Sequence, residues 1–204
     1  MDALIAGYRR FRAGAWRERR DLFESLAARG QSPLVMVVTC SDSRVDPQMV
    51  FDAAPGELFV VRNVANLVPA YAPDAAYHGT SAALEFAVRA LEVRHIVVMG
   101  HAFCGGVRAL LEDMPSPAGD FIGPWMAIAG PARDRALALA TRAPGALQRA
   151  CEHECAKESL ANLATFPWVR ERVEVGTLAL HGCWFDLETG ELLGLGPDGK
   201  FRPV

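Results

Sequence analysis

The chain lacks any run of about 20 consecutive apolar residues, the length needed to span a membrane. Its first residues, 1–4, lack the basic and apolar stretches of a secretory signal peptide. It also lacks an excess of charge of one sign, because 21 Lys and Arg face 24 Asp and Glu, a net charge of −3. This balance gives no electrostatic basis for binding nucleic acid or an anionic lipid surface. We therefore expect neither nucleic acid nor a membrane as a partner.

Cysteine is scarce as well. The five cysteines are an odd number in a chain too long to need disulfide staples. Reduced thiols in the cytoplasm fit this count better than a disulfide framework. The length of 204 residues fits one domain, 1–204, with a substantial core. The apolar fraction of 51% is slightly more than a monomer needs, so we expect a homo-oligomer.

Apolar runs of two periodicities alternate along the chain. Short runs rich in β-branched residues predict strands at 34–39, 58–61, 95–99, 173–181 and 191–196. Apolar residues at helical spacing predict helices within 2–29, 82–91 and 145–164. Strands that alternate with helices predict an α/β fold with a mainly parallel central β-sheet flanked by helices. A helical N-terminal arm, residues 1–30, precedes this sheet.

Two short motifs follow two of the predicted strands. Cys40 directly follows the first strand, and His101 and Cys104 lie just beyond the third. The carboxyl ends of parallel strands meet at one edge of the sheet, so these side chains converge. Two thiolates and one imidazole suit Zn²⁺, and three protein ligands leave a fourth position for water, as in catalytic sites. The sequence therefore predicts one zinc ion per chain, held by Cys40, His101 and Cys104.

A carboxylate and a guanidinium lie beside the first predicted ligand. Asp42 and Arg44 are two residues apart, and an ion pair between them keeps the carboxylate ionised and fixes its direction. A surface salt bridge is the alternative interpretation. A structural zinc site needs no such pair, so Asp42 and Arg44 favour a catalytic site.

A second set of potential ligands is carried by the predicted helix at 145–164. Cys151 and Cys155 share one face at helical spacing, whereas His153 points elsewhere. We therefore expect packing rather than a second metal site. His78 is a candidate proton shuttle, but a capping or exposed histidine is the simpler interpretation.

Cys-x-Asp-x-Arg, followed about sixty residues later by His-x-x-Cys-Gly-Gly, resembles the β-class carbonic anhydrases. The resemblance extends over residues 4–195. Further blocks similar to the family, in the same order, are 41–45, 55–59, 61–66, 158–163 and 181–186. The resemblance implies a zinc lyase that converts carbon dioxide and water into bicarbonate and a proton, reversibly.

The resemblance also implies roles for individual residues. Asp42 would accept a hydrogen bond from the zinc-bound hydroxide, and Arg44 would orient Asp42. The family further implies at least a homodimer, in which the N-terminal arm embraces the partner. The substrate pocket, partly supplied by a neighbouring subunit, would be lined by Gln31, Phe59, Val64, Phe86 and the backbone at Gly105.

Two alternatives and one subtype remain to be distinguished. A hydrolase of CS₂ or COS would keep the same motifs, whereas a non-catalytic zinc-binding regulatory module would not need Asp42 and Arg44.

Some bacterial members have a Trp three residues before the first zinc cysteine, which forms an inhibitory bicarbonate site. This chain has Val37 there, and Thr39 where those members have Gly. We therefore expect the plant-like, non-allosteric subtype.

Overall fold

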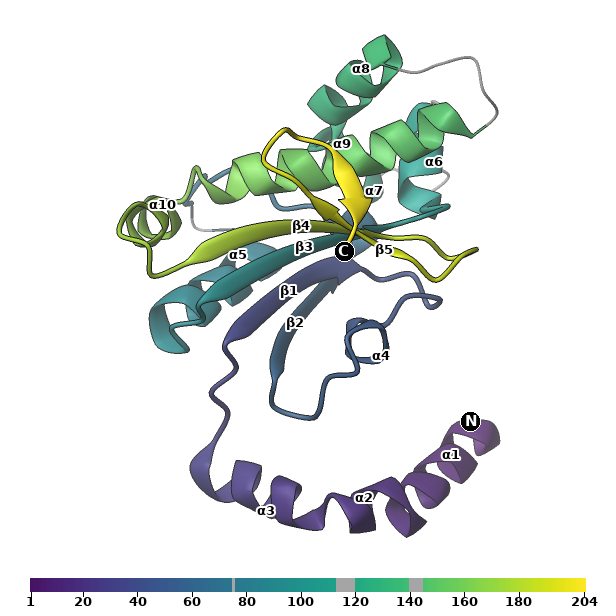
Figure 1. Ribbon diagram of the computed structural model, residues 1–204, viewed down its shortest axis with the longest axis vertical. Helices are drawn as coiled ribbons and strands as arrows, with labels where there is room; N and C mark the ends of the chain where they lie inside the picture. Colours follow the sequence, from purple (N-terminus) through teal and green to yellow (C-terminus); the bar gives the residue numbers. More distant parts are fainter. Residues whose placement is uncertain (75, 113–119, 140–144) are drawn as a thin grey trace.

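The computed structural model describes residues 1–74, 76–112, 120–139 and 145–204. These residues form a six-stranded sheet in the order β2-β1-β3-β4-β5-β6 (Figure 1). The first four strands along the chain run parallel, β5 pairs antiparallel with β4, and β6 pairs antiparallel with β5. The strands are β1 (Val35–Cys40), β2 (Leu58–Asn63), β3 (His95–His101), β4 (Ala179–Phe185), β5 (Leu192–Leu195) and β6 (Phe201–Pro203). The predicted α/β fold with a mainly parallel sheet is confirmed.

The predicted strand at 173–181 is wrong in its first half. Helix α10 (Pro167–Glu174) takes the β-branched residue Val173, because Pro167 at the first helical position starts a helix there. A turn follows, in which Gly176 has φ of +74°, and β4 begins only at Ala179. Strand β6 was not predicted at all. The pattern of apolar residues located the sheet but not this boundary.

One face of the sheet is covered by helices α9 (Ala146–Leu163), α5 (Gly79–Glu85) and α10. Alternate strand residues such as Met36, Val38 and Val98 pack against them, fully buried. Burial of each such side chain contributes about 1.5–3 kcal/mol to folding. Within the described residues, none of the helices is both long and apolar enough to cross a membrane.

Four shorter elements surround the end of the sheet at which β1 and β3 finish. Residues of these elements pack with Cys40 and Cys104 in one buried cluster. These elements are the 3₁₀ turn η1 (Val64–Asn66) and helices α6 (Gly105–Leu111), α7 (Ile122–Ala127) and α8 (Gly130–Leu139). A π-helical turn, η2 (Phe86–Ala90), continues α5.

The opposite face of the sheet is covered less completely. Helix α4 (Pro47–Val50) packs there with Val37 and Met99, and the Asp46 carboxylate caps its first turn. A cavity of about 600 Å³ lined largely by apolar side chains, Val97 among them, remains beside it. This face therefore has room for a further apolar element.

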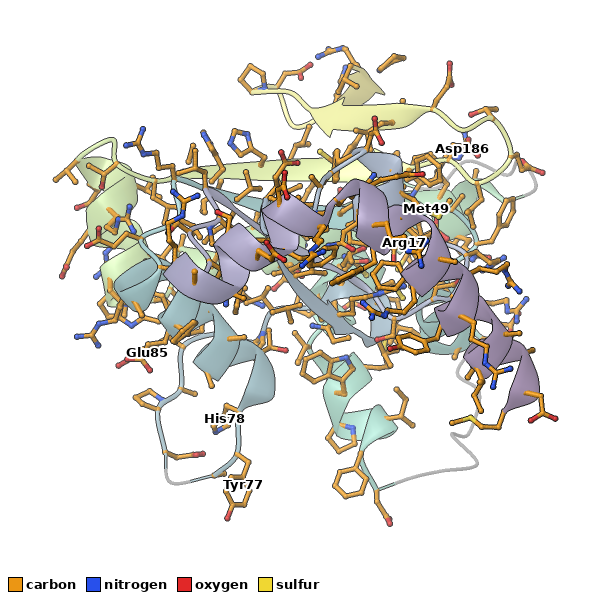
Figure 2. The ribbon with its side chains drawn as sticks, turned by 90° about the horizontal axis from the view of Figure 1, so that it is seen from below. Arg17, Met49, Tyr77, His78, Glu85 and Asp186 are labelled. Atoms are coloured by element: carbon orange, nitrogen blue, oxygen red, sulfur yellow. The ribbon has the colours of Figure 1, made fainter. Side chains whose placement is uncertain are left out.

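The N-terminal arm is helical, as predicted, and projects from the body. It consists of α1 (Asp2–Ala13), α2 (Ala15–Glu18) and α3 (Arg20–Arg29), and none of its residues is buried. Figure 1 shows it joined to the body by the segment before β1, and Figure 2 shows it crossing in front of the sheet. Several apolar side chains of α1 are exposed; Leu4 is 72% exposed and Tyr8 is 60% exposed. In α3, Leu26 lies against Gly56 and is half-buried, whereas the large apolar side chains of α1 stay exposed among the described residues.

Candidate metal centre

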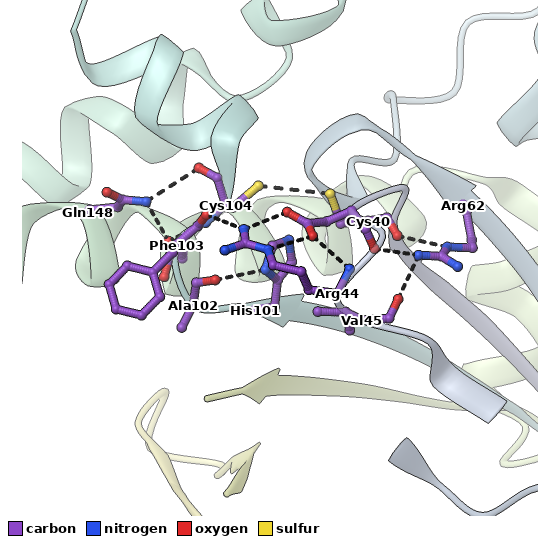
Figure 3. Close-up of polar contacts among 11 residues, drawn as sticks. Cys40, Arg44, Val45, Arg62, His101, Ala102, Phe103, Cys104 and Gln148 are labelled. Carbon is purple, nitrogen blue, oxygen red and sulfur yellow. Dashed lines mark hydrogen bonds and ion pairs between the residues drawn. The ribbon is translucent and has the colours of Figure 1, made fainter. Parts of the chain in front are cut away.

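Three potential ligands lie together at the ends of β1 and β3 and in the turn that follows β3. Cys40 is the last residue of β1, His101 the last of β3, and Cys104 precedes α6 (Figure 3). Their ligand atoms all lie within 4.8 Å of one another, and the two sulfurs are 4.0 Å apart. All three side chains are buried. In the described part of the chain, no other His, Cys, Asp or Glu belongs to this group.

The imidazole of His101 is held in one tautomer. Its Nδ1–H donates to the carbonyl oxygen of Ala102 at 2.9 Å, which leaves the lone pair on Nε2. This Nε2 is buried and has no hydrogen-bond partner among the described residues. A buried polar atom without a partner is costly unless something else binds it. An Nε2 lone pair beside two sulfurs fits a zinc ion.

The two thiols also favour a cation between them. Their hydrogen bond lowers the pKa of Cys40 and raises the pKa of Cys104, because the second thiol donates to the first thiolate. A bound cation stabilises both thiolates, so metal binding and loss of the second proton are linked. Two sulfurs and one imidazole nitrogen are a ligand set that suits zinc.

Asp42 and Arg44 form a bidentate pair beside this group. Arg44 Nε donates to Asp42 Oδ1 at 2.9 Å, and Arg44 Nη2 donates to Asp42 Oδ2 at 2.7 Å. The backbone N–H of Arg44 adds a third bond to Oδ1 at 3.0 Å. These hydrogen bonds hold the pKa of Asp42 well below its usual range, so the carboxylate is ionised. The pair is therefore a fixed hydrogen-bond acceptor next to the three ligands.

Arg44 also links the two ligand loops. Its Nη2 donates to the carbonyl oxygen of Phe103 at 3.0 Å, 59 residues away in sequence. Phe103 has φ of +57°, a left-handed conformation that costs about 1–3 kcal/mol for a residue other than glycine. Such a backbone persists only where surrounding contacts hold it. The turn between His101 and Cys104 is thus strained and fixed from outside.

Arg62 holds the other ligand loop, and the sequence analysis assigned it no role. From β2, its guanidinium donates to the carbonyl oxygens of Cys40, Asp42 and Val45 at 3.0, 2.7 and 2.6 Å. Three bonds from one planar group fix the chain between the first ligand and α4. An arginine directly after the apolar run at 58–61 was the available signal.

The predicted pocket residues lie in three places. Val64 packs with Cys40 and Cys104, and Gly105 directly follows the last ligand. Close packing here requires a neighbouring glycine, because a Cβ at Gly106 would lie 2.8 Å from the Val64 side chain. The other three are farther out: Phe59 and Phe86 contact each other at the β2 edge, with ring centroids 5.9 Å apart, and Gln31 is exposed after the arm.

The remaining candidates lie apart from the metal centre. His78 is exposed in a protruding loop, directly before α5, where it contacts Asp74 at 2.7 Å (Figure 2). It occupies the N-cap position of α5, where its carbonyl oxygen accepts the N–H of Ala82 at 2.8 Å and its side chain makes no cap bond. Cys151 and Cys155 are buried, whereas His153 packs between the rings of other residues and joins no cluster of potential ligands found in the described ranges. His153 thus packs against Trp184 and Phe201, as the packing interpretation predicts.

Comparison with known proteins identifies the family. Residues 35–192 match the family model described as carbonic anhydrase. A carbonic anhydrase of Pseudomonas aeruginosa is 40% identical over 207 residues, covering 99% of this chain and 90% of that protein. The structure of the β-carbonic anhydrase CcaA has a TM-score of 0.92 at 36% identity and covers 100% of this chain and 92% of that one. A structure of the tetrameric β-carbonic anhydrases of Sordaria macrospora has a TM-score of 0.82 at 26% identity, covering 96% of each chain. The chain therefore belongs to the β-class carbonic anhydrase family.

Proposed function

We propose that this chain catalyses the reversible hydration of carbon dioxide to bicarbonate and a proton, with one zinc ion held by Cys40, His101 and Cys104. The observation that carries the proposal is the buried Nε2 of His101, which has no partner among the described residues and lies beside two sulfurs 4.0 Å apart. A structural zinc site closes with four protein ligands, whereas three leave room for a reacting molecule. When bound, zinc supplies a water molecule of lowered pKa as the nucleophile.

Asp42 orients the nucleophile in this proposal. Its ionised carboxylate is an acceptor only, so it takes a hydrogen bond from the attacking water and aims the lone pair at the substrate. Arg44 keeps both carboxylate oxygens in place through its two bonds of 2.9 and 2.7 Å. Arg62 fixes the loop that carries both residues through the carbonyl oxygens of Cys40 and Asp42. The dyad therefore needs no rearrangement before it acts.

Carbon dioxide is small and apolar, so its pocket needs few polar groups. Val64 and the backbone at Gly105 lie beside the ligands and are our proposed lining from the same chain. Gln31, Phe59 and Phe86 are exposed or at the sheet edge. We assign these three to the neighbouring site of a second copy.

The test of this function is a carbon dioxide hydration assay before and after zinc removal. We expect hydration in the zinc-loaded protein, loss on chelation, and recovery when zinc is restored. Parallel assays with COS and CS₂ separate a hydrolase on the same scaffold, which would process these substrates faster than carbon dioxide. Full activity after complete zinc removal would contradict the proposal.

We also propose that the protein is at least a homodimer. The arm exposes an apolar face, and the sheet face beside α4 has a cavity of about 600 Å³ with largely apolar walls. A second copy would cover both, and the tetrameric relatives of Sordaria macrospora support assembly. Deleting residues 1–28 should weaken assembly in light scattering. An active, monodisperse full-length monomer at micromolar concentration would contradict this.

Three further proposals complete the description. We place the whole chain, 1–204, in one catalytic domain, since its described strands form a single sheet. We propose the cytoplasm as its compartment because all five cysteines, each within the described ranges, are free thiols.

We propose the non-allosteric subtype because Val37 is fully buried and has no indole N–H. Bicarbonate inhibition measured near pH 8 should then be simple, and sigmoidal inhibition would contradict it.

A further inference from the structure

Helix α9 carries a buried glutamate whose partners are unusual. Glu152 is 3% exposed, and none of the ion pairs in the described part of the chain includes it. Its Oε1 accepts the backbone N–H of Cys104 at 2.9 Å and the side-chain N–H of Gln148 at 3.0 Å. Its Oε2 accepts the indole N–H of Trp184 at 3.2 Å. A buried carboxyl group is tolerated only where donors of this kind replace water.

One of the three donors belongs to a predicted metal ligand. The other two orient the carboxyl group, because Gln148 is one helical turn before Glu152 and Trp184 lies on β4. The Nε2 of Gln148 also donates to the carbonyl oxygen of Cys104 at 3.4 Å. The main chain of Cys104 is therefore tied to α9 on both its N–H and its C=O side.

The turn that carries Cys104 needs such support. Phe103, the residue before it, is left-handed with φ of +57°, and Arg44 binds its carbonyl oxygen from the Asp42 side. Glu152 binds the next N–H from the α9 side. The strained turn is held between these two contacts. Loss of the second contact would leave the N–H of Cys104 without its acceptor and the turn supported from the Asp42 side alone.

We propose that Glu152 is a positioning residue for the metal centre: its carboxyl group holds the main chain of Cys104, and thereby directs the Cys104 sulfur toward the metal. This inference rests on the proposed function, because it assumes that Cys104 ligates zinc. Groups that orient metal ligands in this way affect metal affinity directly. A cavity of about 570 Å³ borders Glu152, so water can replace a lost contact in part, and the effect is graded.

The same helix supplies a matched control. Glu154, two residues further along, is also buried, at 5% exposure, but it pairs with Arg135 at 2.7 Å and Lys157 at 2.6 Å. It makes no described contact with the ligand loops. Substitution of Glu154 removes a buried carboxylate from α9 without touching Cys104, so it separates positioning of the ligand from stability of the helix.

The experiment compares Glu152→Gln and Glu154→Gln with the wild type by two measurements. One is zinc affinity in competition with a chromogenic chelator, and the other is the sulfur-to-cobalt charge-transfer absorption of the Co²⁺-substituted protein. Glutamine has the size of glutamate but turns one oxygen into an NH₂ donor. At the Oε1 position this donor faces the N–H of Cys104, and at the Oε2 position it faces the indole N–H of Trp184, so one contact that orients the group is lost in either case. We expect about 10- to 100-fold weaker zinc binding and an altered cobalt spectrum for Glu152→Gln. Glu154→Gln should keep the wild-type affinity and spectrum while lowering the melting temperature.

Two results would overturn the inference. One is a Glu152→Gln protein with wild-type zinc affinity and cobalt spectrum, and the other is an equal loss of affinity in Glu154→Gln. If Glu152→Gln does not fold, Trp184→Phe removes one donor and keeps an aromatic ring, and an unchanged cobalt spectrum there would overturn the inference too. A wild-type protein that does not bind zinc would instead refute the proposed function, so the two failures are distinguishable.

Discussion

Two sets of two cysteines and one histidine lie close together in this fold. One is formed by Cys40, His101 and Cys104, and the other is carried by residues 151–155 of α9. All four cysteines belong to the same buried cluster, and in both sets the histidine Nε2 is buried without a partner among the described residues. Only the first set forms a group of potential metal ligands. Composition and burial therefore do not decide which set binds a metal.

The difference lies in how the backbone delivers the side chains. Strand ends and a tight turn bring the first set together, whereas helical spacing sends His153 away from its two cysteines. His153 packs against Trp184 and Phe201, with ring centroids 4.9 and 4.4 Å away, and burial lowers its pKa to about 4. Burial also lowers the pKa of His101, but Cys40 offsets this and raises it overall. One histidine faces thiolate charge and the other faces aromatic rings.

The largest expected effect comes from truncating one cysteine of each set. Cys104→Ala and Cys155→Ala remove the same atoms from side chains that are 1% and 0% exposed. We expect Cys104→Ala to lose both bound zinc and hydration activity, because two ligands do not hold the ion. Cys155→Ala should retain one zinc per chain. Metal analysis of the two purified proteins checks this, and zinc loss in Cys155→Ala would erase the distinction between the sets.

A smaller effect is expected from removing the charge beside the first set. Asp42→Asn keeps the size of the side chain but weakens its acceptor role and its pairing with Arg44. We expect zinc to be retained while hydration falls by about 10²-fold, the range for a positioned acid–base group. Asp46→Asn is the control, since asparagine also caps helices and Asp46 lies on the same loop. Hydration is measured by stopped flow. If Asp42→Asn binds a full complement of zinc and hydrates carbon dioxide at nearly the wild-type rate, Asp42 has no catalytic role.

The smallest expected effect concerns the histidine of the second set. Its pKa is about 4 when folded against about 6.5 when unfolded, so the unfolded chain binds a proton first as pH falls. His153 therefore supports the folded state fully above about pH 6.5, and this stability is lost progressively toward pH 4. His153→Phe should remove that dependence. The unfolding free energy of the variant minus that of the wild type should rise by about 1–2 kcal/mol from pH 7.5 to 5. A constant gap in urea titrations would show that His153 does not titrate in this way.

Much of this comparison could be predicted from the sequence. Ligands placed directly after two parallel strands lie at the same edge of the sheet, so Cys40 and His101 were expected to meet, and the pairing of β1 with β3 brings them together. The i, i+4 spacing of Cys151 and Cys155 equally excluded His153 from their face. The strand at 173–181 failed because a proline two turns earlier started a helix, and local starts of this kind override β-propensity.

The supporting contacts could not be predicted. Nothing in a helical pattern distinguishes Glu152, which binds a ligand backbone, from Glu154, which forms ion pairs, because the difference lies in which loop packs against each. Arg62 likewise gains its role from three carbonyl groups brought beside it by the β1–β2 pairing. Gln31 is exposed in the isolated chain, so its role depends on a second copy that one sequence does not place.

X-ray absorption at the zinc edge of the wild-type protein tests the central claim most directly. It counts the sulfur and the lighter ligands of the bound ion without any substitution. Ligation by Cys40, His101 and Cys104 predicts about two sulfurs near 2.3 Å and nitrogen or oxygen ligands near 2.0–2.1 Å. Three or four sulfurs would contradict it, because zinc would then have recruited Cys151 or Cys155 and lost the open position on which the proposed reaction depends.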